Sequence, residues 1–340
     1  MSKILILGPK MTENNLSYGG VVVLFNDFIN QLKKHHINHT IIDINKNKYK
    51  YNLFLFIVIN FKILLNLKKH SHISLHGTAN NFIFLGPILV IYCKLFNKKL
   101  SLRKFAGNFD KIYQNSSFYK KKIIEFILMN SDCVFFETKY LIDFFIKFNV
   151  NTYWFPNVRS KSEFNTDLNF NKKFIYVGNI QEEKGIDDLL NATKYLPSDY
   201  SVDFYGNIKE DKYYDKDKWQ NKIISYEGVI KPSEVQKKIS EYDVLILPSY
   251  REGYPGVIIE AFSVGVPVIA TELKGISEIV KNGVSGILVP TNNPVKLSEA
   301  IKYFDNENYL QFCNDAKLSF NNFETTIKTN EIIKLILNES

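Results

Sequence analysis

The sequence predicts an α/β protein with two doubly wound, Rossmann-like domains that face each other across a cleft. In both halves of the 340 residues, short β-rich runs alternate with helical stretches, which is typical of a parallel sheet covered on both faces. The alternation breaks once, at the aromatic run 153–157, and a polar stretch follows. We therefore expect an N-terminal domain over 1–157 and a C-terminal domain over 158–323. The sequence leaves open whether a last helix, at about 324–340, packs back on the first domain.

The alternation also gives the individual elements. In the first half it predicts strands at 3–7, 39–44, 72–75, 99–103 and 133–137, and helices at 22–34, 82–96, 120–130 and 140–148. In the second half it predicts strands at 174–177, 201–205, 223–226, 243–247 and 266–270, and helices at 186–195, 231–241, 257–264 and 277–280, with closing helices after a turn at 282–283. Doubly wound sheets bind ligands beyond the carboxyl ends of their strands, so the loops there hold the candidate site residues.

Composition favours a cytoplasmic protein. The three cysteines, Cys93, Cys133 and Cys313, lack metal-like spacing and are odd in number, which fits a reducing compartment. The N-terminal MSKILILGPK has too short an apolar run for a signal peptide. The apolar runs 53–67 and 82–96 are interrupted or fall short of the roughly 20 residues that a membrane span needs.

Charge is divided unevenly along the chain. Residues 1–160 carry 22 Lys and Arg against 8 Asp and Glu, a balance of +14, whereas the remaining residues have a balance of −6. A basic first half favours an anionic partner, and an anionic membrane surface or nucleic acid would both serve. A solvated, lysine-rich surface is the plain alternative.

The densest motif is LPSYREGYPGVIIEAFSVGVPVIAT, residues 247–271. A strand ends at its start, and a loop rich in glycine then opens a helix. The free N–H groups of a helix N-terminus suit a phosphate, and glycines let a ligand approach the backbone closely. We call the glycine-rich loop and this helix N-terminus the phosphate cradle. Glu252 and Glu260, on either side of the cradle, could accept hydrogen bonds from sugar and ribose hydroxyls. From spacing alone, an acidic loop residue and a glutamate that satisfies the helix dipole are equally good readings.

This segment resembles the Glu-x7-Glu signature of retaining glycosyltransferases with the GT-B fold, the glycosyl transferases group 1 (glycosyltransferase family 4). The resemblance continues into the later EIVKNGVSGILVP and covers most of the C-terminal half. It implies that the C-terminal domain binds the nucleotide-sugar and the N-terminal domain the acceptor. It further implies that Glu260 binds the ribose, that Glu252 contacts the transferred sugar as a catalytic residue, and that no metal or other cofactor takes part. The backbone groups implied to meet the sugar and the diphosphate are those of Gly253, Tyr254, Pro255, Gly256 and Val257.

A second matching segment is FIYVGNIQEEKGIDDLLNA, residues 174–192. It resembles the family's strand, Gly-Arg turn and Lys-Gly helix start, which assigns Gly178, Asn179 and Lys184 to the donor site. An ammonium in a loop between a strand and a helix can reach a diphosphate as a mobile point charge, so Lys184 is the expected catalytic phosphate contact. Without the motif, it would be one exposed lysine among many.

The chain departs from the family at Asn179, where the resemblance implies an arginine. A neutral amide cannot replace a bidentate cation, so the charge must come from elsewhere or be weaker. The candidates for this phosphate or acceptor contact are Arg103, Lys104 and Arg159, which follow a strand end or the hinge.

Two features of the first half also resemble parts of the family's site. Gly19 and Gly20, before the helix 22–34, resemble the glycine pair beside the donor diphosphate, although a plain turn is an equal reading. His76, in ISLHGTANN, is the candidate for a catalytic histidine near the reacting sugar, and a structural histidine is about as good a reading. The next strand runs into SLRKFAGNFD, where many relatives have their histidine.

Together the motifs predict transfer of a sugar from an NDP-sugar to a hydroxyl of a saccharide or lipid-linked saccharide acceptor, in surface polysaccharide biosynthesis. The resemblance implies retention of configuration without a protein nucleophile. With such an acceptor, the basic first half favours peripheral contact with the anionic inner face of the membrane, through 82–96 or the helix of Lys120, Lys121 and Lys122. No nucleic acid partner is expected.

Other classes remain open on the same fold. A phosphorylase or an epimerase would need catalytic groups of its own, which the sequence does not display. A non-catalytic nucleotide- or glycan-binding protein would be consistent with the neutral Asn179. A dinucleotide-dependent dehydrogenase is set aside, because LGPKMTENN after the first strand lacks Gly-x-Gly-x-x-Gly.

Overall fold

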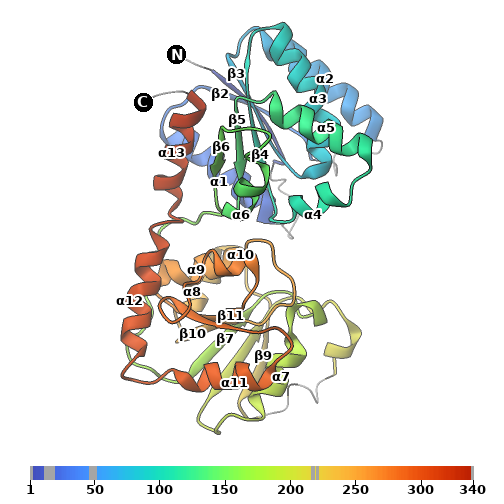
Figure 1. The fold of residues 1–340 in the computed structure, drawn as a ribbon. Helices are drawn as coiled ribbons and strands as arrows, with labels where there is room; N and C mark the ends of the chain where they lie inside the picture. The colour runs from blue at the N-terminus through green and yellow to red at the C-terminus, as the bar shows by residue number, and fades with distance from the viewer. Residues whose placement is uncertain (1–2, 11–19, 46–51, 216–218, 220–221, 338–340) are drawn as a thin grey trace. The chain divides into compact units, whose positions relative to one another are not determined.

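The protein forms two compact units. The computed structural model describes residues 3–10, 20–45, 52–215, 219 and 222–337. One unit comprises Met1–Asn157 together with Thr325–Ser340, and the other comprises Val158–Glu324. Each is built around a six-stranded sheet whose neighbouring strands are all parallel (Figure 1). The C-terminal helix therefore belongs to the first unit.

The first unit has the strand order β2-β1-β3-β4-β5-β6. Its strands are β1 (Ile4–Gly8), β2 (His39–Asp43), β3 (His72–Gly77), β4 (Lys99–Lys104), β5 (Cys133–Phe136) and β6 (Thr152–Trp154). Its helices are α1 (Gly20–Lys34), α2 (Asn52–Leu67), α3 (Ala79–Leu95), α4 (Phe109–Gln114), α5 (Phe118–Met129), α6 (Lys139–Phe145) and α13 (Thr325–Leu337).

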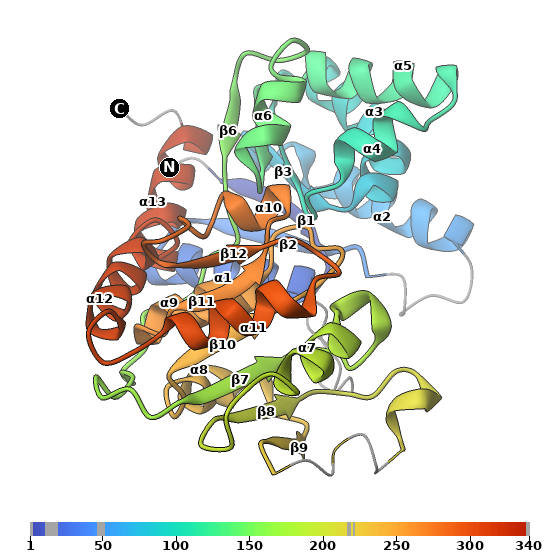
Figure 2. The same cartoon turned by 60° about the horizontal axis from the view of Figure 1, so that its bottom comes forward.

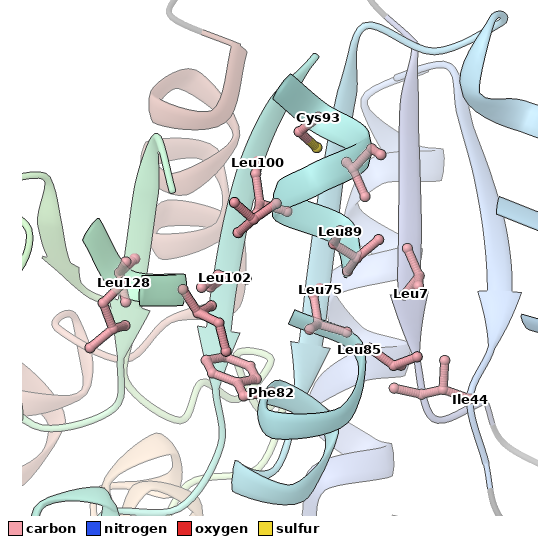
Figure 3. Packing of buried hydrophobic residues seen from close by; sticks show 14 of the residues in the cluster. Leu7, Ile44, Leu75, Phe82, Leu85, Leu89, Cys93, Leu100, Leu102 and Leu128 are labelled. Carbon is pink, nitrogen blue, oxygen red and sulfur yellow. The ribbon is translucent and has the colours of Figure 1, made fainter. Parts of the chain in front are cut away.

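Helices cover both faces of this first sheet. The layer of α2, α3 and α5 buries a continuous apolar cluster, in which Leu85 and Leu89 of α3 lie beside Leu7 and Leu75 of the strands (Figure 3). On the other face, α1 packs beside α13 and its Phe28 ring lies 4.7 Å from the His76 ring. Because both faces are covered, side chains of either parity along the central strands are buried.

The second unit has the strand order β12-β11-β10-β7-β8-β9. Its strands are β7 (Lys173–Val177), β8 (Ser201–Tyr205), β9 (Ile224–Gly228), β10 (Val244–Leu247), β11 (Val268–Thr271) and β12 (Gly286–Val289). Its helices are α7 (Ile186–Thr193), α8 (Val235–Ile239), α9 (Gly256–Val264), α10 (Lys274–Ser277), α11 (Pro294–Tyr303) and α12 (Tyr309–Phe320). Helices α7 and α11 lie together on one face, and α8 and α9 lie together on the other (Figure 2).

The predicted doubly wound α/β architecture is confirmed, with differences at individual elements. The predicted break at 153–157 begins inside a strand, β6, because three residues are enough to add an edge strand to β5. The strand β12 and the helices α2 and α4 were not among the predicted elements. The helix expected at 277–280 instead spans Lys274–Ser277.

Neither apolar run forms a membrane span. Across the described parts of the chain, no helix combines the length and the apolar character needed to cross a bilayer.

The three cysteines are free and buried. Burial raises the pKa of the Cys93 thiol to about 12 and that of the Cys133 and Cys313 thiols to about 11.

Candidate functional site

The strand order of the second unit places a crossover point between β7 and β10. These strands are neighbours, with Phe174 beside Val244, and the chain winds from β7 toward β9 and from β10 toward β12 in opposite directions. In a doubly wound sheet, ligands bind outside the carboxyl ends of the strands where the winding direction reverses. The loops that follow β7 and β10 hold Lys184 and Glu252, so topology and motif point to the same edge.

These two loops are held against each other. The backbone N–H of Tyr250 donates to the carbonyl oxygen of Glu183 over 3.0 Å. Gly185 has a φ of 70°, and an ideal Cβ on it would lie 2.0 Å from the carbonyl oxygen of Pro248. Only glycine combines this left-handed backbone with such close approach. The Lys-Gly pair therefore positions Lys184 directly beside the β10 loop.

Lys184 and Glu252 form an ion pair at this edge. The Lys184 Nζ lies 2.6 Å from the Glu252 Oε1, and the two side chains are 22% and 13% exposed. The Ser249 hydroxyl donates to the same Glu252 oxygen over 2.9 Å, and the Thr271 hydroxyl donates to the Ser249 carbonyl oxygen over 2.6 Å. Glu252 is thus oriented by an ammonium and a buried hydroxyl while remaining in contact with solvent.

The N-terminus of α9 adjoins this ion pair in sequence. Its cap residue, Pro255, makes no side-chain hydrogen bond to the first turn, which leaves the positive end of the helix dipole without a side-chain cap. Side chains four residues apart lie one above the other and tilt toward the helix N-terminus, so Glu260 lies on the face of Gly256. The Arg159 Nε donates to the Glu260 Oε1 over 2.6 Å. A second cation–carboxylate pair therefore lies on this helix terminus.

In the loop between β10 and α9 and at the start of α9, residues 253–257 offer a ligand backbone groups rather than side chains. Tyr254 and Pro255 are buried, and the Tyr254 ring packs 6.4 Å from the ring of Phe323. An ideal Cβ on Gly275, at the start of α10, would lie 1.7 Å from the Gly253 carbonyl oxygen. The loop is thus supported from beneath by α10, while Gly256 and Val257 are half-buried at the helix start.

The turn after β7 has a neutral residue where a cation was implied. Asn179 is exposed, and its carbonyl oxygen accepts a hydrogen bond from the Tyr176 hydroxyl over 2.8 Å. Burial raises the pKa of Tyr176 well above its usual range, so this hydroxyl stays a donor. The Gly178 N–H donates to the Tyr205 carbonyl oxygen over 2.9 Å. The turn is rigidly held and carries no charge of its own.

Sequence reasoning did not find Ser249, Tyr176 or Gly275. The Tyr176 and Ser249 hydroxyls donate to residues three positions along the chain, and Gly275 packs against Gly253; the spacing of the motifs singles out none of the three. For Ser249, its position two residues after the end of β10 was the one available signal, because carboxyl strand ends meet at the ligand edge.

The candidates from the first unit are mostly buried. His76, Arg103 and Lys104 are each 1% exposed, so a ligand would reach them only after the side chains that cover them had moved. The Arg103 guanidinium lies 3.4 Å from the centre of the Phe155 ring. Gly20 is the first residue of α1, and Gly19 lies outside the described residues.

Burial also determines the protonation of these groups. It lowers the pKa of Arg103 to about 9 and that of Lys104 to about 8, and it lowers the pKa of His76 well below 6.5. The His76 Nε2 is 2.9 Å from the Ser74 hydroxyl, which accepts from the Ser101 hydroxyl over 2.8 Å. Neutral His76 is therefore part of a buried hydroxyl–imidazole chain on the sheet. Among the described residues, no group of three or more His, Cys, Asp or Glu is arranged to hold a metal.

Comparison with known proteins identifies the family of the second unit. Residues 158–317 match the family model described as "Glycosyl transferases group 1". A protein from the cps region of Klebsiella pneumoniae is 27% identical over 74% of this chain and 73% of its own length. The capsular polysaccharide biosynthesis glycosyltransferase CapM of Staphylococcus aureus is 29% identical over 46% of this chain and 42% of its own length.

Solved structures give the fold of the whole chain. HepE from Anabaena, crystallised with UDP, aligns over 99% of this chain and all of its own, with a TM-score of 0.76 and 14% identity. The lipopolysaccharide outer core galactosyltransferase WaaB aligns over 99% of this chain with a TM-score of 0.74 and 14% identity. The second unit therefore belongs to the glycosyl transferases group 1 family, and the whole chain has the GT-B fold.

Proposed function

We propose that this glycosyltransferase moves a sugar from an NDP-sugar to a hydroxyl of a saccharide or lipid-linked saccharide, with retention of configuration, in surface polysaccharide biosynthesis. The observation that carries the proposal is the pair of cation–carboxylate contacts at the crossover edge of the second sheet, Lys184–Glu252 and Arg159–Glu260. The names of CapM and of TuaC, a putative teichuronic acid glycosyltransferase of Bacillus subtilis, support this class of acceptor.

Donor binding would separate the Lys184–Glu252 pair and add new partners to Glu260. A diphosphate carries the charge that an ammonium prefers, and sugar hydroxyls can donate to a carboxylate. The diphosphate would lie at the α9 N-terminus and form an ion pair with Lys184. Glu252 would accept hydrogen bonds from the hydroxyls of the transferred sugar, and Glu260 would accept them from the hydroxyls of the ribose. Each contact that is lost within the protein is replaced by one to the donor.

The chemistry would depend on charge that develops at the leaving group. As the bond from the anomeric carbon to the diphosphate breaks, negative charge grows on the diphosphate oxygens. A fixed ammonium and a helix N-terminus stabilise this charge without reorganisation at the moment of reaction. On the same face, the departing diphosphate would accept the proton of the acceptor hydroxyl, which then forms the new bond to the anomeric carbon.

The proposal is tested by Lys184→Ala. We expect kcat to fall about 100- to 1,000-fold, as for other removed transition-state donors, with a melting temperature close to that of the wild type. The matched control is Lys296→Ala, which breaks an exposed ion pair to Glu299 in the same unit. Transfer by Lys184→Ala at the rate of the control would contradict the site assignment. Wild-type binding of the nucleotide without transfer or hydrolysis would instead support the non-catalytic alternative.

The nucleotide is identified by a thermal-shift series with UDP, GDP and ADP. A ligand that binds only the native state raises the melting temperature according to its concentration relative to Kd. We expect the largest shift with UDP, because HepE, which has the same fold, was crystallised with UDP and with UDP-glucose. A larger shift with GDP or ADP would reassign the base.

We also propose that the first unit contacts an anionic membrane peripherally, through the layer of α2, α3 and α5. Between residues 52 and 130 the chain has 12 Lys and Arg against 2 Asp and Glu. The layer exposes large apolar side chains, including Phe61 and Leu65 of α2, Phe84 and Leu95 of α3 and Phe118 of α5. Apolar side chains surrounded by lysines suit insertion among anionic headgroups.

Sedimentation with phosphatidylglycerol vesicles tests this contact. The wild type should pellet at low salt and be released at high salt, because the lysine contribution is screened. Replacing Phe61 and Leu65 with serine should weaken the partition about 5- to 10-fold through lost apolar insertion. The control replaces Leu310 and Leu318, which are exposed leucines of α12 in the second unit. Equal pelleting of the two variants would contradict the assigned surface.

A further inference from the structure

Arg159 reaches the N-terminus of α9 from the segment that follows β6. Its backbone N–H donates to the Phe323 carbonyl oxygen over 3.0 Å, and its Nη1 donates to the Val158 carbonyl oxygen over 2.9 Å. Its Nε donates to Glu260, and its side chain is 16% exposed. The guanidinium is therefore anchored on two sides, and part of it remains open to a ligand.

Gly256 provides the space that Arg159 occupies. An ideal Cβ on Gly256 would lie 2.0 Å from the Arg159 Nη2 and 2.8 Å from its Cζ. The guanidinium thus lies over the first residue of α9, beside the N–H groups of the first turn. Within the described parts of the chain, Nη2 makes no hydrogen bond, so its two hydrogens are available at the place where a phosphate would bind.

The charge balance of the site depends on Arg159. Lys184 and Arg159 balance the carboxylates of Glu252 and Glu260. Without Arg159 the four positions would carry a net charge of −1, and a diphosphate would approach an unpaired Glu260. Asn179 adds no charge from the other side of the cradle. An arginine over the helix start removes this repulsion and adds donors for the phosphate oxygens.

We propose that Arg159 is the arginine that this chain uses at the donor diphosphate, in place of the one implied at Asn179. Nε keeps Glu260 oriented for the ribose and Nη1 keeps its bond to the Val158 carbonyl oxygen, while Nη2 donates to a phosphate oxygen at the start of α9. The inference rests on the proposed function, since it concerns the same nucleotide. It assigns the diphosphate contact to a segment outside both sequence motifs.

Calorimetric titration separates this role from simple neutralisation of Glu260. The titrants are the nucleoside diphosphate that the wild type binds and the matching nucleoside. Arg159→Met should weaken the diphosphate about 10- to 100-fold and the nucleoside much less, because it removes charge-assisted hydrogen bonds to phosphate. Arg159→Lys should restore part of this loss, because it returns the point charge but not the planar fork.

The decisive comparison is made in a Glu260→Gln background, where Glu260 has no charge to neutralise. Adding Arg159→Met should again weaken the diphosphate about 10-fold or more. A change of less than about twofold in this background would overturn the proposal, since Arg159 would then serve only to hold Glu260. If the wild type binds no nucleoside diphosphate, the proposed function fails; if it binds and this comparison shows no change, only the present inference fails.

A compensating substitution tests the replacement directly. Asn179→Arg puts the cation back at the implied position, and in the Arg159→Met background it should recover most of the lost diphosphate affinity. The matched control is Asn191→Arg on α7, a partly exposed asparagine outside both loops. Failure of Asn179→Arg to exceed this control would contradict the claim that Arg159 and an arginine at 179 are alternatives.

Discussion

At the scale of single residues, the two glycines that bound α9 serve different purposes. Gly256 begins the helix and leaves room for Arg159, whereas Gly265 ends it with a φ of 81° and no atom closer than 3.7 Å to an added Cβ. We expect Gly256→Ala to displace Arg159 and weaken nucleoside diphosphate binding about 10-fold. Its melting temperature should change little, because alanine favours a helix.

Gly265→Ala is the matched control, with the opposite expected outcome. Its backbone strain should lower the free energy of unfolding by about 1 kcal/mol, while nucleotide affinity stays at the wild-type value. Calorimetry gives both quantities for both variants. Equal nucleotide affinities in the two variants would contradict the role assigned to Gly256.

The site could be predicted from the sequence only as far as local motifs reach. Lys184 and Glu252 lie in loops that follow strands, and Glu260 lies in the helix after the second loop, so the motifs were enough to predict them. The pairing of Arg159 with Glu260 joins residues 101 positions apart, and no spacing rule predicts such a contact. The burial of Arg103 and Lys104 could not be predicted from the sequence either, because a strand covered on both faces buries polar and apolar positions alike.

At the scale of elements, α10 supports the loop between β10 and α9. The Gly253 carbonyl oxygen lies where a Cβ on Gly275 would be, at 1.7 Å. We expect Gly275→Ala to force α10 and the loop apart, to lower stability by about 2 kcal/mol or more, and to weaken nucleotide binding at the same time. Chemical denaturation and titration of the same sample measure the two effects.

Gly283→Ala serves as the comparison, since Gly283 has a φ of 73° but no atom within 4 Å of an added Cβ. It should lose only about 1 kcal/mol from strain, with unchanged nucleotide affinity. A Gly275→Ala protein that matched it in both measurements would show that α10 does not support the loop.

Element prediction succeeded for most strands and missed β6, β12, α2 and α4. The strands β3, β4 and β8 are continuous β-rich runs, and their predicted ranges agree with the structure within two residues. β6 and β12 have three and four residues, so each is fixed by pairing with its neighbour rather than by local preference. α2 is apolar nearly all round, which hides a helical period.

At the scale of the whole molecule, the two units should respond differently to acid. All six histidines lie in the first unit, and burial lowers the pKa of His72 to about 4 and that of His76 well below 6.5. The unfolded chain therefore binds more protons than the folded one between pH 6.5 and 4, so stability falls as the pH falls through this window. For His72 alone the loss from pH 7 to pH 5 is about 2 kcal/mol.

Two carboxylates of the second unit change stability with pH in the opposite direction. Burial raises the pKa of Asp203 and Asp243, so their folded forms bind protons more readily, and lowering the pH relieves the cost of burying the carboxylates. Differential scanning calorimetry at pH 7 and pH 5 should show the transition of the first unit moving to lower temperature relative to that of the second. His72→Gln should reduce this separation and the exposed His35→Gln should not; equal effects of the two would contradict the assignment.

The path of the chain into and out of the second unit has a consequence for how such proteins diversify. Arg159, just after the entry, pairs in parallel with Glu324, just before the exit, and its N–H bonds to Phe323. The two junctions are thus side by side, and residues 158–324 form an insertion with adjoining ends. Recombination at both junctions would exchange the whole insertion as a cassette and leave the first sheet, with α13 on its face, topologically intact. In such a lineage, residues 158–324 could be replaced while the first unit stayed unchanged.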